Sequence, residues 1–127
     1  MPVDVTDVRD YLNKMNKERI PDEVIVKQLA VALPIINDSC SASVDTKTKD
    51  MALTVYASYL SYQAYCTEYE RTVGRVPDFM VGHLQIIADT ANVYLRLISK
   101  GNPVYTCPAA QNISMESSLS TVSLSNL

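Results

Sequence analysis

The chain has 127 residues, of which 47% are hydrophobic and 20% are charged, and its formal net charge is −3. This length allows one domain with a modest core, and the slight negative charge argues against a protein that binds nucleic acid through a basic surface. The three glycines are too few for the phosphate-binding loops of doubly wound folds, so we exclude those classes.

Two helices are predicted in the first forty residues. Val5, Val8 and Leu12 recur at helical spacing, and with Thr6 as the N-cap they predict a short helix over about residues 6–15. The sequence Pro-Asp-Glu at 21–23 suits a helix first turn, because proline has no amide to lose there and the acids face the positive end of the helix dipole. We expect a second helix over about 21–39, with a kink or a break at Pro34.

Two longer helices are predicted next. Asp45 as the N-cap and Gly74 as a left-handed terminator predict a third helix of about 28 residues, or ~42 Å. Pro77 and Asp78 begin a fourth helix, whose apolar residues alternate spacings of four and three, and Lys100 with the following glycine ends it. The predicted fold class is all-α, a bundle of about four helices with an extended C-terminal tail.

The composition changes after Gly101. Residues 102–127 hold one charge, Glu116, together with two prolines and a dense run of serines. Their apolar side chains are too sparse for a core, so we expect 1–101 to form the bundle and 102–127 an arm that docks on a partner subunit, with its strand pairing left open. Truncation after Gly101 is then expected to leave the helical fold intact. The predicted partner-binding residues are Val104, Tyr105, Ile113, Leu119, Val122, Leu124 and Leu127.

The two long helices carry few charges. Residues 51–101 contain four basic and four acidic side chains, a smaller share than the ~25% typical of soluble domains. The third helix is apolar nearly all round, which favours burial on most sides. Its tyrosines are either internal core or, as we prefer, at least partly a subunit interface, because tyrosine combines contact area with a hydroxyl that tolerates water. These residues are Tyr56, Tyr59, Tyr62, Tyr65 and Tyr69.

Residues that could carry chemistry are scarce. His83 is the only histidine, and it has neither a second histidine nor a Glu-x-x-His pattern with which to bind a metal. No Gly-x-Ser-x-Gly sequence is present, and Cys40, Cys66 and Cys107 are odd in number and widely spaced, which favours a reducing compartment over disulfides. No stretch has the length and apolarity of a membrane span. We therefore expect a protein that is not an enzyme and binds no cofactor or metal.

The order of the predicted elements resembles a known family. A short helix VTDVRDYLNKM, a second segment IPDEVIVKQLAVALPIIND, a long helix from VDTKTKDMALTVYASYLSYQAY to ERTVGRVP, a fourth helix ending LISKG and an extended tail follow one another. This layout over about residues 4–101 resembles the small helical head-tail connector proteins of tailed bacteriophages, also called adaptor or head-completion proteins.

The resemblance implies a non-enzymatic part of the virion neck, made in the host cytoplasm. Such proteins assemble as homo-oligomeric rings, usually twelve-fold, beneath the portal protein, extend the DNA channel and offer a platform for the next neck or tail component. DNA would pass through without sequence-specific binding, which suits a mildly negative lumen. The alternatives are a cytoplasmic helical protein–protein interaction module, or another neck component such as a stopper or tail-completion protein.

Overall fold

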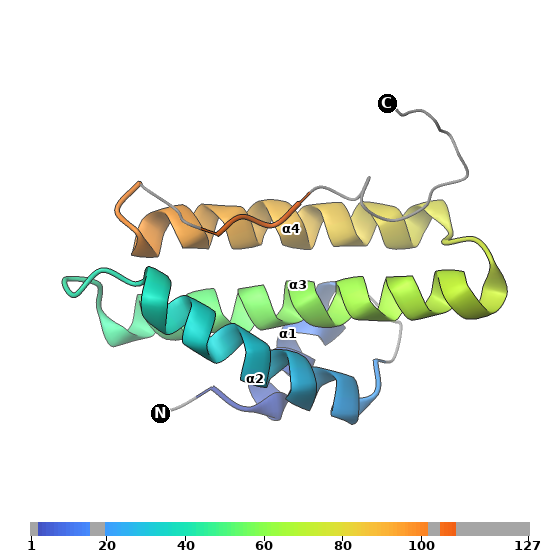
Figure 1. Cartoon of the computed structure of the whole chain (residues 1–127), viewed down its shortest axis with the longest axis horizontal. Helices are drawn as coiled ribbons and strands as arrows, with labels where there is room; N and C mark the ends of the chain where they lie inside the picture. Colours follow the sequence, from blue (N-terminus) through green and yellow to red (C-terminus); the bar gives the residue numbers. More distant parts are fainter. Residues whose placement is uncertain (1–2, 16–19, 102–104, 109–127) are drawn as a thin grey trace.

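The protein is a bundle of four helices, as the sequence predicts (Figure 1). The computed structural model describes residues 3–15, 20–101 and 105–108, and this part of the chain contains no strand. The helices are α1 (Val5–Met15), α2 (Asp22–Ser39), α3 (Thr46–Val73) and α4 (Asp78–Ile98). The long helix α3 lies between α4 and α2, and both neighbours run antiparallel to it.

The ends of α3 are set by local chemistry, and both predictions for them are confirmed. The Asp45 carboxylate accepts a hydrogen bond from the Thr48 amide at 3.3 Å and from the Thr48 hydroxyl at 2.7 Å. This pairing satisfies one of the amides that a helix N-terminus leaves free. At the other end Gly74 adopts a φ of 108°, which a residue with a Cβ rarely reaches, and its amide donates to Glu70 O.

The first helix begins slightly earlier than predicted. Asp4, and not Thr6, acts as its cap: the Asp7 amide donates to the Asp4 carboxylate, and the Asp4 amide donates to the Asp7 carboxylate. This reciprocal pairing satisfies two backbone donors at once, as in a capping box. Farther along α1, the Arg9 guanidinium forms an ion pair with Asp22 at the start of α2.

The helix α2 continues through Pro34, so of the expected kink or break the break does not occur. Proline removes one backbone hydrogen bond from a helix interior, but tertiary packing can compensate for that loss. Ala32 and Ile36, on either side of Pro34, are both fully buried, and their contacts hold the two turns in one helix.

The loop after α2 is tied to the end of α4. The Ser41 amide donates to Ile98 O at 2.7 Å, so the start of α3 and the end of α4 are held together. The helix α4 then ends as predicted, because Gly101 has a φ of 89° and its amide donates to Arg96 O.

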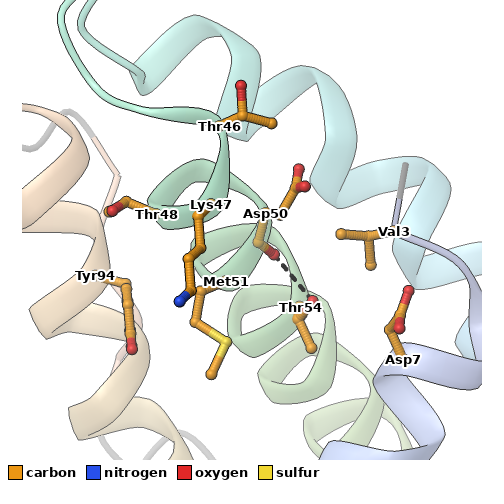
Figure 2. Close-up of a pocket in the computed structure, with 9 residues that line it drawn as sticks. All are labelled: Val3, Asp7, Thr46, Lys47, Thr48, Asp50, Met51, Thr54 and Tyr94. Atoms are coloured by element: carbon orange, nitrogen blue, oxygen red, sulfur yellow. Dashed lines mark hydrogen bonds between the residues drawn. The ribbon is translucent and has the colours of Figure 1, made fainter. Parts of the chain in front are cut away.

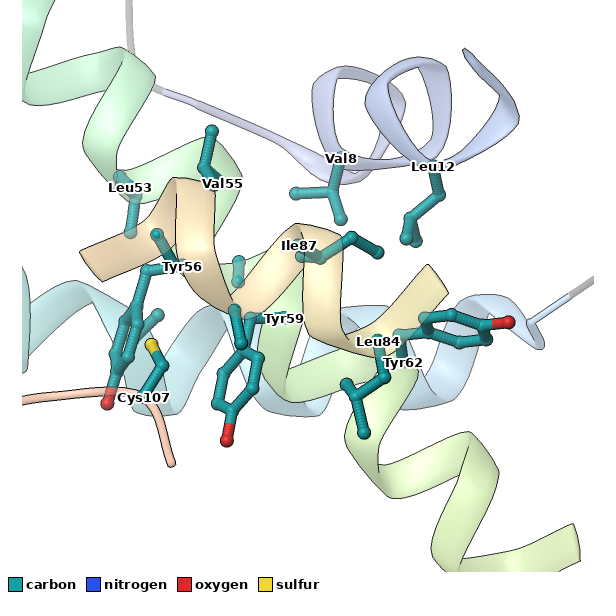
Figure 3. Packing of buried hydrophobic residues seen from close by; sticks show 14 of the residues in the cluster. Val8, Leu12, Leu53, Val55, Tyr56, Tyr59, Tyr62, Leu84, Ile87 and Cys107 are labelled. Carbon is teal, nitrogen blue, oxygen red and sulfur yellow. The ribbon is translucent and has the colours of Figure 1, made fainter. Parts of the chain in front are cut away.

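The middle of α3 is buried by the rest of its own chain. Helices α4, α2 and α1 all pack on it, and residues 105–108 run back along α4. Figure 3 shows part of the resulting core, in which tyrosines of α3 meet aliphatic side chains of α1 and α4. The largest fully buried side chains are Tyr59, Tyr62, Leu12, Ile20, Ile25, Ile36, Met80, Leu84, Ile87, Leu95, Ile98 and Val8.

Candidate functional site

Three of the five tyrosines predicted at a subunit interface are buried by the chain itself. Tyr56, Tyr59 and Tyr62 expose 6%, 2% and 0% of their surface in a single copy. A side chain with so little accessible surface cannot form much contact with a neighbour, so the interface prediction is wrong for these three residues. Its premise, that a small domain cannot surround so long a helix, fails for the middle of α3, where the bundle and residues 105–108 together bury these side chains.

The other two tyrosines lie nearer the surface. Tyr65 and Tyr69 are half-buried against the core, and the Tyr65 ring stacks on Tyr62 with a centroid distance of 6.3 Å. For these two residues the interface role stays a prediction.

Residues 105–108 belong to the bundle and not to a separate arm. The Cys107 backbone is held on both sides by Asn92 of α4, and the Tyr59 hydroxyl donates to Pro108 O at 3.1 Å. The Cys107 side chain is buried next to Tyr56 (Figure 3). The expected boundary at residue 101 is therefore corrected, because the described part of the 102–127 segment packs on its own chain.

The tail residues predicted to bind a partner are mostly outside the described residues. Tyr105 is described and remains about one-third exposed. The role of the others stays a prediction, because they lie outside the residues that the structure describes. They are Val104, Ile113, Leu119, Val122, Leu124 and Leu127.

A stripe of exposed apolar side chains follows one face of α4. Phe79, Ile86, Val93 and Leu97 each keep about half of their surface exposed. Their spacing returns to the same side of the helix every two turns, and Thr90 fills the gap in the same pattern. We call these five residues the α4 stripe. Exposed apolar surface of this extent on one helix is a feature of protein contact sites.

A second stripe lies on α2. Val26 and Leu33 are also about half exposed, and Ala30 between them is exposed. The three residues lie at i, i+4 and i+7, and therefore on one face of the helix. We call them the α2 stripe.

Between α1 and α4 the surface is hollowed into a groove of about 670 Å³ over the first turns of α3 (Figure 2). Tyr94 of α4 forms one wall and Val3 the other, with Met51 and Thr54 of α3 between them. The remaining lining residues are polar, namely Asp7, Thr46, Lys47, Thr48 and Asp50. Because Tyr94 follows Val93 directly, this α1/α4 groove adjoins the α4 stripe.

Charges are distributed unevenly around the two stripes. The exposed acids Asp22 and Glu23 lie at the start of α2, and Asp38 lies near its end. In contrast, exposed Arg96 and Lys100 lie at the C-terminal end of α4. The N-terminal end of α2 is thus acidic and the C-terminal end of α4 is basic.

The single histidine, His83, lies next to two aromatic rings. His83 is half-buried, its Nδ1 lies 3.3 Å from the Tyr62 hydroxyl, and Phe79 packs against its ring edge-on. Among the described residues, no group of three or more His, Cys, Asp or Glu side chains could hold a metal ion. The geometry around His83 is accounted for by packing on α3.

The titratable groups under the 105–108 segment are shifted by burial. Loss of solvation raises the pKa of the Cys107 thiol to about 12 and that of Tyr56 to about 12, and it also raises the pKa of Tyr59. Burial disfavours the charged form of each group. A raised pKa keeps the Cys107 thiol in its neutral form, which is the less nucleophilic one.

The two stripes are the surface features that the sequence reasoning missed. The seven-residue spacing of Phe79, Ile86 and Val93 is visible in the sequence, and it lies beside the core spacing of Met80, Leu84 and Ile87. Periodicity shows two apolar faces on α4 but not which one the bundle buries. That distinction required the positions of the neighbouring helices.

Comparisons with protein-family models, with curated proteins and with solved structures found no match for this chain. No helix within 3–15, 20–101 or 105–108 combines the length and the apolarity needed to cross a membrane.

Proposed function

We propose that this chain is a structural subunit of a bacteriophage neck, a head-tail connector that forms a ring beneath the portal protein and extends the DNA channel. The order and relative lengths of α1 to α4 fit the layout by which the sequence resembles these connectors. The observation that carries the proposal is the presence of two exposed apolar stripes on different helices of a bundle whose own core is complete.

Two separate stripes suit a ring better than they suit a monomer. In a closed ring every subunit uses one surface to contact the preceding copy and a different surface to contact the next one. Exposed side chains such as Leu33 on α2 and Leu97 on α4 would be covered in such an assembly. Covering them would favour association through the hydrophobic effect.

The charge of the chain fits a DNA channel. A protein that neutralises many phosphates holds DNA tightly, and a net charge of −3 avoids that outcome. The proposed partners are therefore further copies of the chain, the portal protein and the next neck or tail component, with DNA passing through unbound.

The proposal is tested on virions of the virus that encodes this chain. Cryo-microscopy of the neck, with mass spectrometry of the purified particle, is expected to find the chain as a ring next to the portal. Absence of the chain from purified virions, together with a monomer in solution, would contradict the proposal.

A second candidate is a helical interaction module that acts as a monomer or dimer. The observations in its favour are the self-contained core and the α1/α4 groove, whose volume of about 670 Å³ falls within the range of ligand-binding clefts. This function predicts a stable monomer or dimer at all concentrations and no ring in particles. Light scattering of the purified chain separates the two functions.

A further inference from the structure

We infer that the α2 stripe of one copy packs on the α4 stripe of a neighbouring copy, with the two helices antiparallel. This inference rests on the proposed homo-oligomeric function and names the surfaces that would carry it. The occupant of each stripe is a second copy of the same chain, so that copies join head to tail.

The residues of the α2 stripe and part of the α4 stripe recur at the same intervals when the two helices are antiparallel. On α2 the stripe residues are Val26, Ala30 and Leu33, and on α4 the corresponding positions at the same intervals are 90, 93 and 97. In antiparallel packing Leu97 lies opposite Val26, Val93 opposite Ala30 and Thr90 opposite Leu33. Val93 thereby faces the small side chain of Ala30 in the middle of the contact, which lets the two helices approach each other.

The charges at the ends of the stripes favour this antiparallel arrangement. Beyond the pair of Leu97 and Val26, exposed Lys100 follows the end of α4 in one copy, and exposed Glu23 lies in the first turn of α2 in the other. Opposite charges at the rim of an interface fix its register more than they add affinity. Antiparallel packing also places the positive end of the α2 dipole near the negative end of α4.

Symmetric pairing of either stripe with itself is less favourable. Two α4 stripes packed antiparallel would bring the exposed Asp89 of each copy together near the twofold axis. Two α2 stripes would bring Glu23 of each copy toward Asp38 of the other. Like charges facing each other across an interface disfavour it, whereas the pairing of α2 with α4 brings Glu23 toward Lys100.

The contact area requires more than the α4 stripe alone. A stable interface takes about 800 Å² from each partner, and the four large side chains of the stripe are each only half exposed. The adjoining α1/α4 groove, with exposed Met51 beside Tyr94, supplies further apolar surface. We therefore place the edge of the incoming α2 over this groove.

The test uses one charged substitution in each stripe of the full chain. Leu33→Glu blocks the α2 stripe and Leu97→Glu blocks the α4 stripe, and both sites are exposed, so the fold should persist, as circular dichroism will verify. By sedimentation velocity each variant alone is expected to be a monomer. An equimolar mixture is expected to form dimers, because each variant still carries one intact surface that fits the other.

A matched control lies on the opposite face of α2. Val31 is exposed to a similar degree but is outside the stripe, so Val31→Glu is expected to associate like the wild type. Charge reversal gives a second test: Lys100→Glu and Glu23→Lys each weaken association about tenfold or more, and combining both in one chain restores it.

Several outcomes would overturn the inference. They are a wild type that stays monomeric at high concentration, a Leu33→Glu variant that still associates alone, and a Val31→Glu variant that is as damaged as Leu33→Glu. Virions whose ring tolerates both stripe variants would overturn only this contact and leave the connector function standing. A chain that pairs as inferred but is absent from virions would overturn only the connector function.

Discussion

Asn92 of α4 holds the backbone of Cys107 with both ends of its side-chain amide. The Asn92 Nδ2 donates to Cys107 O at 3.0 Å, and the Asn92 Oδ1 accepts from Cys107 N at 2.6 Å. This is the pairing that a backbone neighbour would give in a sheet, here supplied by one side chain. It fixes residues 105–108 over the tyrosines of α3 and so completes the core.

Substitution of this clamp is expected to destabilise the bundle. Asn92→Ala removes two hydrogen bonds to a part-buried backbone, and it is expected to lower the free energy of unfolding by about 2 kcal/mol. It should also make the Cys107 thiol accessible, so that alkylation at this cysteine accelerates. Urea unfolding and mass spectrometry of the labelled peptide measure the two effects. Asn13→Ala, at an exposed site on α1, is the control; unchanged alkylation in Asn92→Ala would contradict the prediction.

Truncation measures how much residues 105–108 contribute to the stability of the bundle. A chain ending at Gly101 loses the cover over Tyr56 and Tyr59, so we expect the free energy of unfolding to fall by about 2–4 kcal/mol. This expectation replaces the one drawn from the sequence, in which removal of the tail leaves the bundle unaffected. A chain ending at Pro108 is the matched control, and we expect it to be more stable than the chain ending at Gly101. Equal stability of the two truncated chains would show that the segment contributes nothing.

The buried serines of α3 offer a paired comparison. Ser61 Oγ is buried and has no hydrogen-bond partner within the described part of the chain, whereas Ser58 Oγ donates to Thr54 O at 2.7 Å. Removing an unsatisfied buried hydroxyl relieves a desolvation cost, so Ser61→Ala is expected to raise the free energy of unfolding by about 1 kcal/mol. Ser58→Ala should give a smaller gain or a loss. Thermal and urea unfolding would contradict this account if Ser61→Ala were the more destabilising of the two.

Alkaline pH is expected to weaken the contact between α3 and the 105–108 segment. Burial raises the pKa of Tyr56 from 10.0 to about 12, so the folded state prefers the neutral phenol. The corresponding stability is fully present below pH 10 and is lost as the pH rises from 10 to about 12. Urea unfolding between pH 9 and 11.5 should therefore show a steeper loss for the wild type than for Tyr56→Phe. Identical slopes for the wild type and Tyr56→Phe would refute the assignment.

Much of the fold could be predicted from the sequence because helix ends are local. Asp45, Gly74 and Gly101 act through hydrogen bonds and backbone angles within one turn of their own position, so their residue types suffice to place the boundaries. The N-cap of α1 was misplaced by two residues because Thr6 and Asp4 are both competent caps, and only the reciprocal pairing with Asp7 selects Asp4.

The tertiary structure alone decided which apolar faces are inside. The sequence shows that α3 is apolar nearly all round and that α4 has two apolar faces, but helical periodicity carries no information about neighbours from distant parts of the chain. Asn92 and Cys107 are 15 residues apart, and their contact buries Tyr56 and Tyr59 while the stripe ending at Leu97 stays exposed. Burial depends on three-dimensional packing, so the candidate contact surface lies on α2 and α4 and not on Tyr56, Tyr59 and Tyr62, which the sequence alone favoured.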